Sequence, residues 1–261
     1  MKRPALSICI PASEGGLSLL SNTLDSLDAQ TSDNFEVVVG WDSPHVAFPS
    51  HELPEICVPL EWAWSPRTAG QEHLPHRNHA RNTAARIALG EYLWFIDADF
   101  LLDPWAVTYM IMHLEKGVAL TPTLCGIGEH GQPLDNQWSG LASSYRSKRL
   151  SYVDAGPIPE GFPALHRDVF RALGGFDERF IGWGGNKEEF VSRLNRVGDL
   201  VPYRLLHGVR GYHQRHPPNK GDAPLVERNQ IVHQQIKRDM DGGADWWLER
   251  VANVREVLQH G

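Results

Sequence analysis

A chain of 261 residues is long enough for one large α/β domain or two small ones. With 41% hydrophobic and 22% charged residues, it has the composition of an ordinary globular protein. The formal net charge of −7 argues against a nucleic-acid partner, because phosphate backbones are bound mainly by clustered Lys and Arg, and these residues are dispersed here.

The cysteines and the apolar runs indicate the cellular compartment in which the protein is expected. Cys9, Cys57 and Cys125 are an odd number with no metal-type spacing, and the first two lie in apolar runs, where a thiol packs as a small core residue. A reducing compartment fits this pattern best. The first strand-like segment begins too early for a signal peptide, and no apolar run approaches the roughly 18 residues of a membrane-spanning helix. We therefore expect a cytoplasmic protein, with peripheral membrane contact left open.

Strand-like and helix-like stretches alternate through the first half of the chain, which predicts an α/β fold with a mostly parallel sheet covered by helices. The expected strands are 6–10, 35–39, 56–62 and 92–96, and the expected helices are 17–27 and 77–89. We expect Gly90 to close the second helix, and Asp103-Pro104 to begin a third. Polar loops follow residues 10, 39 and 96, the second of them at 40–44. Ligands of open α/β sheets bind at such strand ends.

The second half of the chain is less regular. We expect loops at 126–140 and 213–224, a strand at 161–166, and helices at 167–173, 186–197 and 245–258. No linker or repeat is evident, so we expect a single domain. Its parts would be a nucleotide-binding half (1–100), an acceptor-binding and catalytic half (101–225) and C-terminal helices (226–261).

Two carboxylates follow directly on the strand expected at 92–96. Asp97 and Asp99 flank one small residue, and alternate side chains of an extended segment point to the same face. Both can therefore converge on one hard cation, Mn²⁺ or Mg²⁺, which leaves positions open for phosphate oxygens. On their own, the two acids could equally cap the helix that comes next.

Four motifs in chain order resemble those of GT-A-fold, family-2-type glycosyltransferases. SICIP at 7–11 and FEVVV at 35–39 resemble the first two strands of that family, and ARNTAARIALGEYLWFIDAD at 80–99 resembles its stretch ending in DAD. GGFDERF at 174–180, followed by GWGG at 182–185, resembles an element shared by galactosyltransferases, polypeptide GalNAc-transferases and chondroitin-type polymerases. The matching segments run from residue 6 to residue 213, most of the chain.

The resemblance implies a nucleotide-diphosphate-sugar donor, with UDP-sugars favoured, and a hydroxyl acceptor such as a glycan. It implies that Asp42 recognises the nucleoside, the alternative being a turn-forming role beside Ser43-Pro44. It also implies a third metal ligand late in the chain, and His213 is favoured over His216. The donor-binding residues expected on this basis are Pro11, Ser13, Asp42, Arg81, Asn82, Asp97 and Arg215. Arg215 would help to neutralise the leaving diphosphate from a mobile lid at 213–224.

One departure from the family pattern comes after the GWGG element. Relatives carry GGED or GGEN there, and this chain has Lys187 at the position of the base. A lysine of ordinary pKa is protonated at neutral pH and cannot take a hydroxyl proton. Glu188 and Glu189 are the substitutes within reach. Asn186 and Glu189 also fit the ends of a capping box, which would explain Glu189 without catalysis.

The GWGG element itself suits a sugar. The indole of Trp183 offers an apolar face to a pyranose ring, and Gly184 and Gly185 let backbone donors approach closely. We expect these three residues and Lys187 to contact the sugar or the acceptor.

Metal-assisted sugar transfer, with inversion at the anomeric carbon, is the function that the sequence favours. A nucleotidyltransferase on a related sheet is one alternative, but it would want a Lys near the glycines at 15 and 16, and none is there. The other alternative is a non-catalytic relative that kept the fold and lost the base.

Overall fold

The computed structural model describes residues 3–45, 47–67, 71–126, 163–214 and 222–260, with only the backbone described for 123–126 and for most of 205–213. Most of the loop expected at 126–140, and the residues Arg215 and His216, lie outside the described residues. In the described parts of the chain, every helix is too short or too polar to span a membrane.

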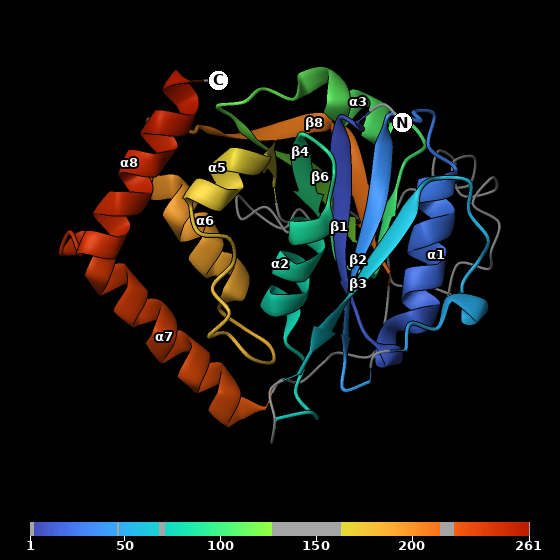
Figure 1. The fold of residues 1–261 in the computed structure, drawn as a ribbon, viewed down its shortest axis with the longest axis horizontal. Coiled ribbons are helices and arrows are strands. Elements are labelled where there is room, and N and C mark those ends of the chain that lie inside the picture. Colours follow the sequence, from blue (N-terminus) through green and yellow to red (C-terminus); the bar gives the residue numbers. More distant parts are fainter. Residues whose placement is uncertain (1–2, 46, 68–70, 127–162, 215–221, 261) are drawn as a thin grey trace.

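One eight-stranded sheet runs through the molecule in the order β3-β2-β1-β4-β7-β6-β8-β5 (Figure 1). The strands β1 to β4 pair in parallel, whereas β7 is antiparallel to both of its neighbours and β5 is antiparallel to β8. The expected mostly parallel α/β sheet is confirmed. The strands are β1 Leu6–Ala12, β2 Phe35–Ser43, β3 Leu60–Pro66, β4 Tyr92–Phe95, β5 Phe100–Leu102, β6 Ala119–Gly126, β7 Ala164–His166 and β8 Tyr203–His213.

Helices cover both faces of the sheet because strands such as β1 and β2 are buried on both sides. Helices α1 and α3 share one apolar cluster with Ile8 and Val37, and α2, α5, α6, α7 and α8 share the other with Cys9 and Val38. Figure 1 shows α7 and α8 as an outer layer beyond α5 and α6. The helices are α1 Leu17–Asp28, α2 Arg77–Ile87, α3 Ala106–His113, α5 Arg167–Ala172, α6 Asn186–Arg196, α7 Ala223–Asp241 and α8 Asp245–Gln259.

Two glycines that were expected in a loop and at a helix end have packing roles instead. The loop expected at 40–44 is wrong, because β2 continues to Ser43. Gly40 lies within it where α2 crosses so closely that a Cβ would come 2.0 Å from the Ala80 carbonyl oxygen. The expected closure of α2 by Gly90 is also wrong. The helix ends at Ile87, and a Cβ on Gly90 would come 2.5 Å from Ser7.

Other boundaries and one burial expectation also differ. The third strand spans Leu60–Pro66 rather than 56–62, because it pairs with the extended end of β2. Helix α3 begins at Ala106 rather than at Asp103-Pro104. A turn precedes it, in which the backbone N–H of Ala106 donates to the Asp103 carbonyl. Cys9 is buried as expected, but Cys57 is exposed. The loop expected at 213–224 is shorter at both ends, since β8 runs to His213 and α7 begins at Ala223.

Candidate active site

A cavity of about 600 Å³ opens at the carboxyl ends of β1, β2 and β4. Parallel strands end at the same edge of a sheet, so the segments after Ile10, Val39 and Ile96 converge there, as expected from the sequence. The cavity is lined by Pro11, Ala12, Ser13, Gly15, Gly16, Leu19, Asp42, Arg67, His73, Pro75, Arg77, Asp97, Ala98 and Asp99. Four of the expected donor-binding residues, Pro11, Ser13, Asp42 and Asp97, are therefore brought together.

Asp97 is held from behind by a buried arginine. The Arg81 guanidinium, on α2, donates to Asp97 Oδ1 at 2.6 Å and to Asn78 Oδ1 at 3.1 Å. The side chain of Arg81 is 2% exposed, whereas that of Asp97 is 41% exposed toward the cavity. Burial alone would raise the pKa of Asp97, but the charges of Arg81, Arg77 and Lys187 outweigh it and hold that pKa below its usual value. Asp97 therefore stays ionised at neutral pH.

Asp99 lies beside the end of β8. Its carbonyl oxygen accepts a hydrogen bond of 2.8 Å from the backbone N–H of Gln214, and Phe100 is paired with His213. The Gln214 side chain is buried and donates to Leu19 O and Thr23 Oγ1, which fixes the strand end against α1. The backbone of His213 is thus placed next to the two acids, as a third metal ligand requires, while its side chain lies outside the described part of the molecule.

The described side chains supply part of a binding site for a hard divalent cation. Two carboxylates from one strand end face the same cavity, and oxygen donors are those that Mn²⁺ and Mg²⁺ take beside phosphate. Among the described side chains, no group of three His, Cys, Asp or Glu is spaced to hold a metal. A complete site would therefore need the His213 side chain or a ligand's own oxygens.

Asp42 is a strand residue rather than a turn former. It is 2% exposed, and its two carboxylate oxygens accept from Arg67 Nε and from the backbone N–H of His76, both at 2.9 Å. Arg67 also donates to the Asp42 carbonyl at 3.0 Å and to the Glu72 carbonyl at 2.6 Å. Asp42 therefore organises the segment that joins β3 to α2 and closes one wall of the cavity.

That segment supplies site residues that the sequence analysis missed. Arg67, His73 and Pro75 line the cavity and lie outside every motif and periodic pattern, and Arg77, the first residue of the helix that follows, also lines it. The available signal was the run HLPHRNH at 73–79, in which basic residues gather just before a helix.

The GWGG element lies at the rim of this cavity. The backbone N–H of Gly182 donates to the Pro75 carbonyl at 2.8 Å, and Gly184 and Gly185 take φ values of 95° and 79°, which favour glycine. Trp183 is 50% exposed. The positive charge of Lys187 contributes to the lowered pKa of Asp97, so the start of α6 lies within electrostatic range of this acid although it does not line the cavity itself.

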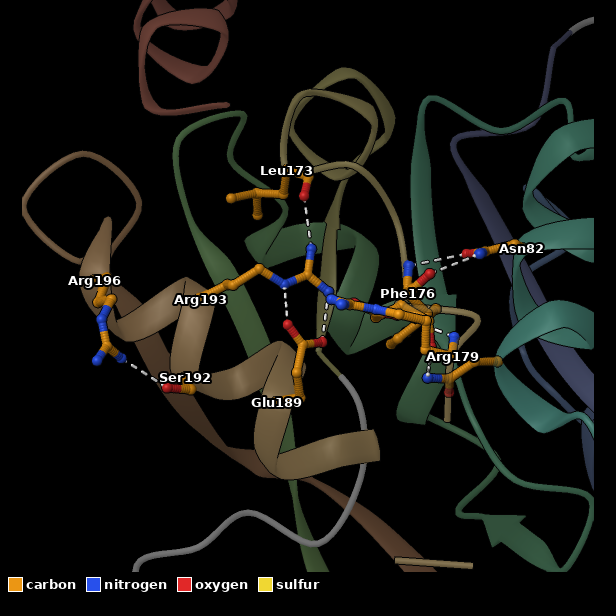
Figure 2. A network of polar contacts seen from close by, with 10 residues as sticks. Asn82, Leu173, Phe176, Arg179, Glu189, Ser192, Arg193 and Arg196 are labelled. Atoms are coloured by element: carbon orange, nitrogen blue, oxygen red, sulfur yellow. Dashed lines mark hydrogen bonds and ion pairs between the residues drawn. The ribbon is translucent and has the colours of Figure 1, made fainter. Parts of the chain in front are cut away.

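The capping box that offered an alternative explanation of Glu189 does not form at α6. Gly185, not Asn186, is the N-cap, and the Glu189 side chain makes no cap but pairs with Arg193 at 2.5 Å, both being buried (Figure 2). Arg193 also donates to the Leu173 carbonyl at 2.6 Å. The Glu189 carboxylate is therefore buried in an ion pair within the core. Glu188 is exposed on the first turn of α6 and outside the cavity.

Asn82 lies outside the cavity too, contrary to the expectation that it is near the donor. Its amide donates to the Phe176 carbonyl and to Glu178 Oε1, and its oxygen accepts from the Phe176 backbone N–H (Figure 2). Asn82 therefore joins α2 to the GGFDERF segment and does not line this cavity.

The sheet order, the cavity at the strand ends and its paired acids define a protein of the GT-A fold. Two solved structures share the fold at low sequence identity. GalNAc-T7 with UDP, GalNAc and Mn²⁺ aligns with a TM-score of 0.60 and 17% identity over 90% of this chain and 48% of that one. TarS 1–349 of S. aureus in complex with UDP aligns with a TM-score of 0.54 and 16% identity over 87% of this chain and 64% of that one.

Two family models match parts of the sequence. Residues 73–174 match the model of glycosyl transferase family 2, and residues 158–207 match that described as the N-terminal domain of galactosyltransferase. Residues 73–174 thus resemble family-2 glycosyltransferases and residues 158–207 resemble a galactosyltransferase-type element, which confirms the resemblance seen in the motifs.

Two curated relatives show how much of a longer protein this domain matches. Validoxylamine A glucosyltransferase of Streptomyces hygroscopicus subsp. jinggangensis is 27% identical over 81% of this chain and 56% of its own length. N-acetylgalactosaminyltransferase 6 of Drosophila melanogaster is 26% identical over 100% of this chain and 40% of its own length. The chain therefore spans only about half the length of these relatives.

Proposed function

We propose that this chain transfers a sugar from a nucleotide-diphosphate sugar, with a UDP-sugar favoured, to an acceptor hydroxyl, assisted by Mn²⁺ or Mg²⁺. The observation that carries the proposal is the convergence of Asp42, Asp97 and Asp99 on one cavity of about 600 Å³ at the strand ends. The family match and the UDP and Mn²⁺ bound to the fold neighbours support it.

In the proposed donor complex, the nucleoside lies toward Pro11, Ser13 and Asp42, and the diphosphate lies toward Asp97 and Asp99. Asp42 is rigid before any ligand arrives, because Arg67 and the His76 backbone already hold both of its oxygens. Asp97, Asp99 and His213 would hold the cation, which would offset the charge of the departing diphosphate.

The acceptor would approach from the GWGG rim. Trp183 offers its exposed indole face to a sugar ring, and Lys187 would attract an anionic group on the acceptor. Glu188 is the proposed base, because it is exposed next to Lys187 in the first turn of α6, whereas Glu189 is paired in the core. Its carboxylate would take the hydroxyl proton as the acceptor oxygen bonds to the anomeric carbon and the bond to the diphosphate breaks, with inversion.

Titration calorimetry with UDP and GDP tests the donor site. Binding should require Mn²⁺ or Mg²⁺ and should disappear in EDTA. A panel of UDP-sugars with Mn²⁺ should then show donor turnover. Failure of the wild-type chain to bind either nucleotide in the presence of metal would refute the proposal.

A non-catalytic, sugar-binding relative is the second candidate. The buried ion pair between Glu189 and Arg193 favours this candidate, because it makes one of the two carboxylates near Lys187 unable to act as a base. UDP-sugar binding without hydrolysis or transfer to any acceptor would support this candidate over the enzyme.

A further inference from the structure

Among the described residues, three arginines line or border the cavity, and the structure shows two of them bonded to other parts of the protein. Arg81 is bonded to Asp97 and Asn78. Arg67 is bonded to Asp42 and to the Glu72 carbonyl. The guanidinium group of Arg81 therefore holds Asp97, and that of Arg67 holds Asp42 and the cavity wall.

The third arginine, Arg77, differs. It is the first residue of α2, lines the cavity and is partly buried. Its guanidinium makes no hydrogen bond or ion pair with any residue that the structure describes, yet its charge lowers the pKa of Asp97. A partly buried cation without a fixed partner is costly unless a ligand supplies one, and a guanidinium matches phosphate oxygens in a bidentate geometry.

Resting on the function proposed above, we propose that Arg77 binds the diphosphate of the donor. Its position beside the two acids places a positive charge where the phosphates must meet Asp97 and Asp99. Arg77 would then share the negative charge of the leaving group with the divalent cation, and it would do so from a helix that is already packed on the sheet.

This assignment predicts opposite effects on two ligands. The Arg77 charge attracts a diphosphate but repels a free cation approaching Asp97, so its removal should weaken UDP binding and strengthen binding of Mn²⁺ alone. Loss of one charge-assisted contact should reduce UDP affinity by about 10- to 100-fold. The gain in affinity for Mn²⁺ should be smaller, about twofold to fivefold, because water screens the exposed side of the site.

Calorimetry on the full chain tests the proposal with UDP plus Mn²⁺, uridine, and Mn²⁺ alone as probes. Arg77→Gln should show the two opposite shifts with uridine affinity unchanged, and Arg77→Lys should recover part of the UDP affinity. Arg86→Gln is the matched control, since Arg86 lies on the same helix but is 57% exposed and pairs with Glu178 outside the cavity.

The outcomes separate this proposal from the function on which it rests. Unchanged UDP affinity in Arg77→Gln, with wild type binding UDP, overturns the role of Arg77 and leaves the proposed function standing. Joint loss of UDP and Mn²⁺ binding in Arg77→Gln would mark a structural role and also overturn it. Failure of the wild type to bind either UDP or GDP in the presence of metal would overturn the proposed function itself.

Discussion

Replacement of Glu189 by Gln tests whether this carboxylate is structural. Glu189 and Arg193 are 1% and 0% exposed, and the guanidinium donates to both carboxylate oxygens at 2.5 and 2.7 Å. Glutamine keeps the shape and one acceptor oxygen but removes the charge, which leaves Arg193 as a buried cation. Removing one partner of a buried pair costs about 3–5 kcal/mol. The glutamine oxygen and the Leu173 carbonyl would still accept hydrogen bonds from Arg193. We therefore expect the free energy of unfolding to fall by about 3 kcal/mol, the low end of this range.

Urea and thermal unfolding measure this loss. For a chain of this size, about 3 kcal/mol should lower Tm by about 6–12 °C. Below the transition, kcat should stay at the wild-type value. The double variant Glu189→Leu with Arg193→Met is the control. It removes both charges and should recover most of the stability, because well-packed apolar residues can replace a buried ion pair.

The reverse result would refute the reasoning. If Glu189→Gln were as stable as wild type and its turnover fell by about 10²–10⁴-fold, the usual share of a general base, Glu189 would be catalytic. Its pairing with Arg193 would then have to open during turnover.

Three other acidic residues test the site and its surroundings. Asp99→Ala should abolish metal-dependent UDP binding in calorimetry; undiminished binding in EDTA would contradict the metal assignment. Glu188→Gln should lower kcat by about 10²–10⁴-fold with UDP affinity unchanged, and near-wild-type turnover would remove Glu188 as the base. Burial alone would raise the pKa of Asp177, but its bonds to Arg179 lower it below the ordinary value, so its stabilising effect is present above about pH 4 and is lost as the pH falls further. The unfolding free energies of wild type and Asp177→Asn should therefore differ at pH 7 and converge toward pH 2; a constant difference would contradict the ion pair.

The ordered motifs predicted the fold and the core of the site because they combine local pattern with position at strand ends. Asp97 and Asp99 come directly after a continuous apolar run, so their place at the carboxyl edge could be predicted from the sequence alone. Gly40 misled the prediction because Asp42, Ser43 and Pro44 follow it closely and are typical turn residues, whereas here the glycine permits the close approach of a helix.

The remaining errors arise from tertiary contacts that a local pattern does not encode. Glu189 fits a capping box by spacing, but the helix begins one residue earlier than that spacing needs, and burial beside Arg193 decides its role. Arg67 belongs to a segment without periodicity and Arg77 is the first residue of the helix after it; they meet the acids only because the chain returns over the strand ends.

Helix α2 fixes the spacing between Asp97 and the GGFDERF segment. On one side Arg81 holds Asp97, and on the other Asn78 and Asn82 bond to the backbone of Asp177 and Phe176. Each residue added to or deleted from an α-helix rotates the later residues of that helix by about 100°. A length change inside α2 would therefore break the link between Asp97 and the GGFDERF segment, so variation in chain length among functional relatives should fall outside this helix.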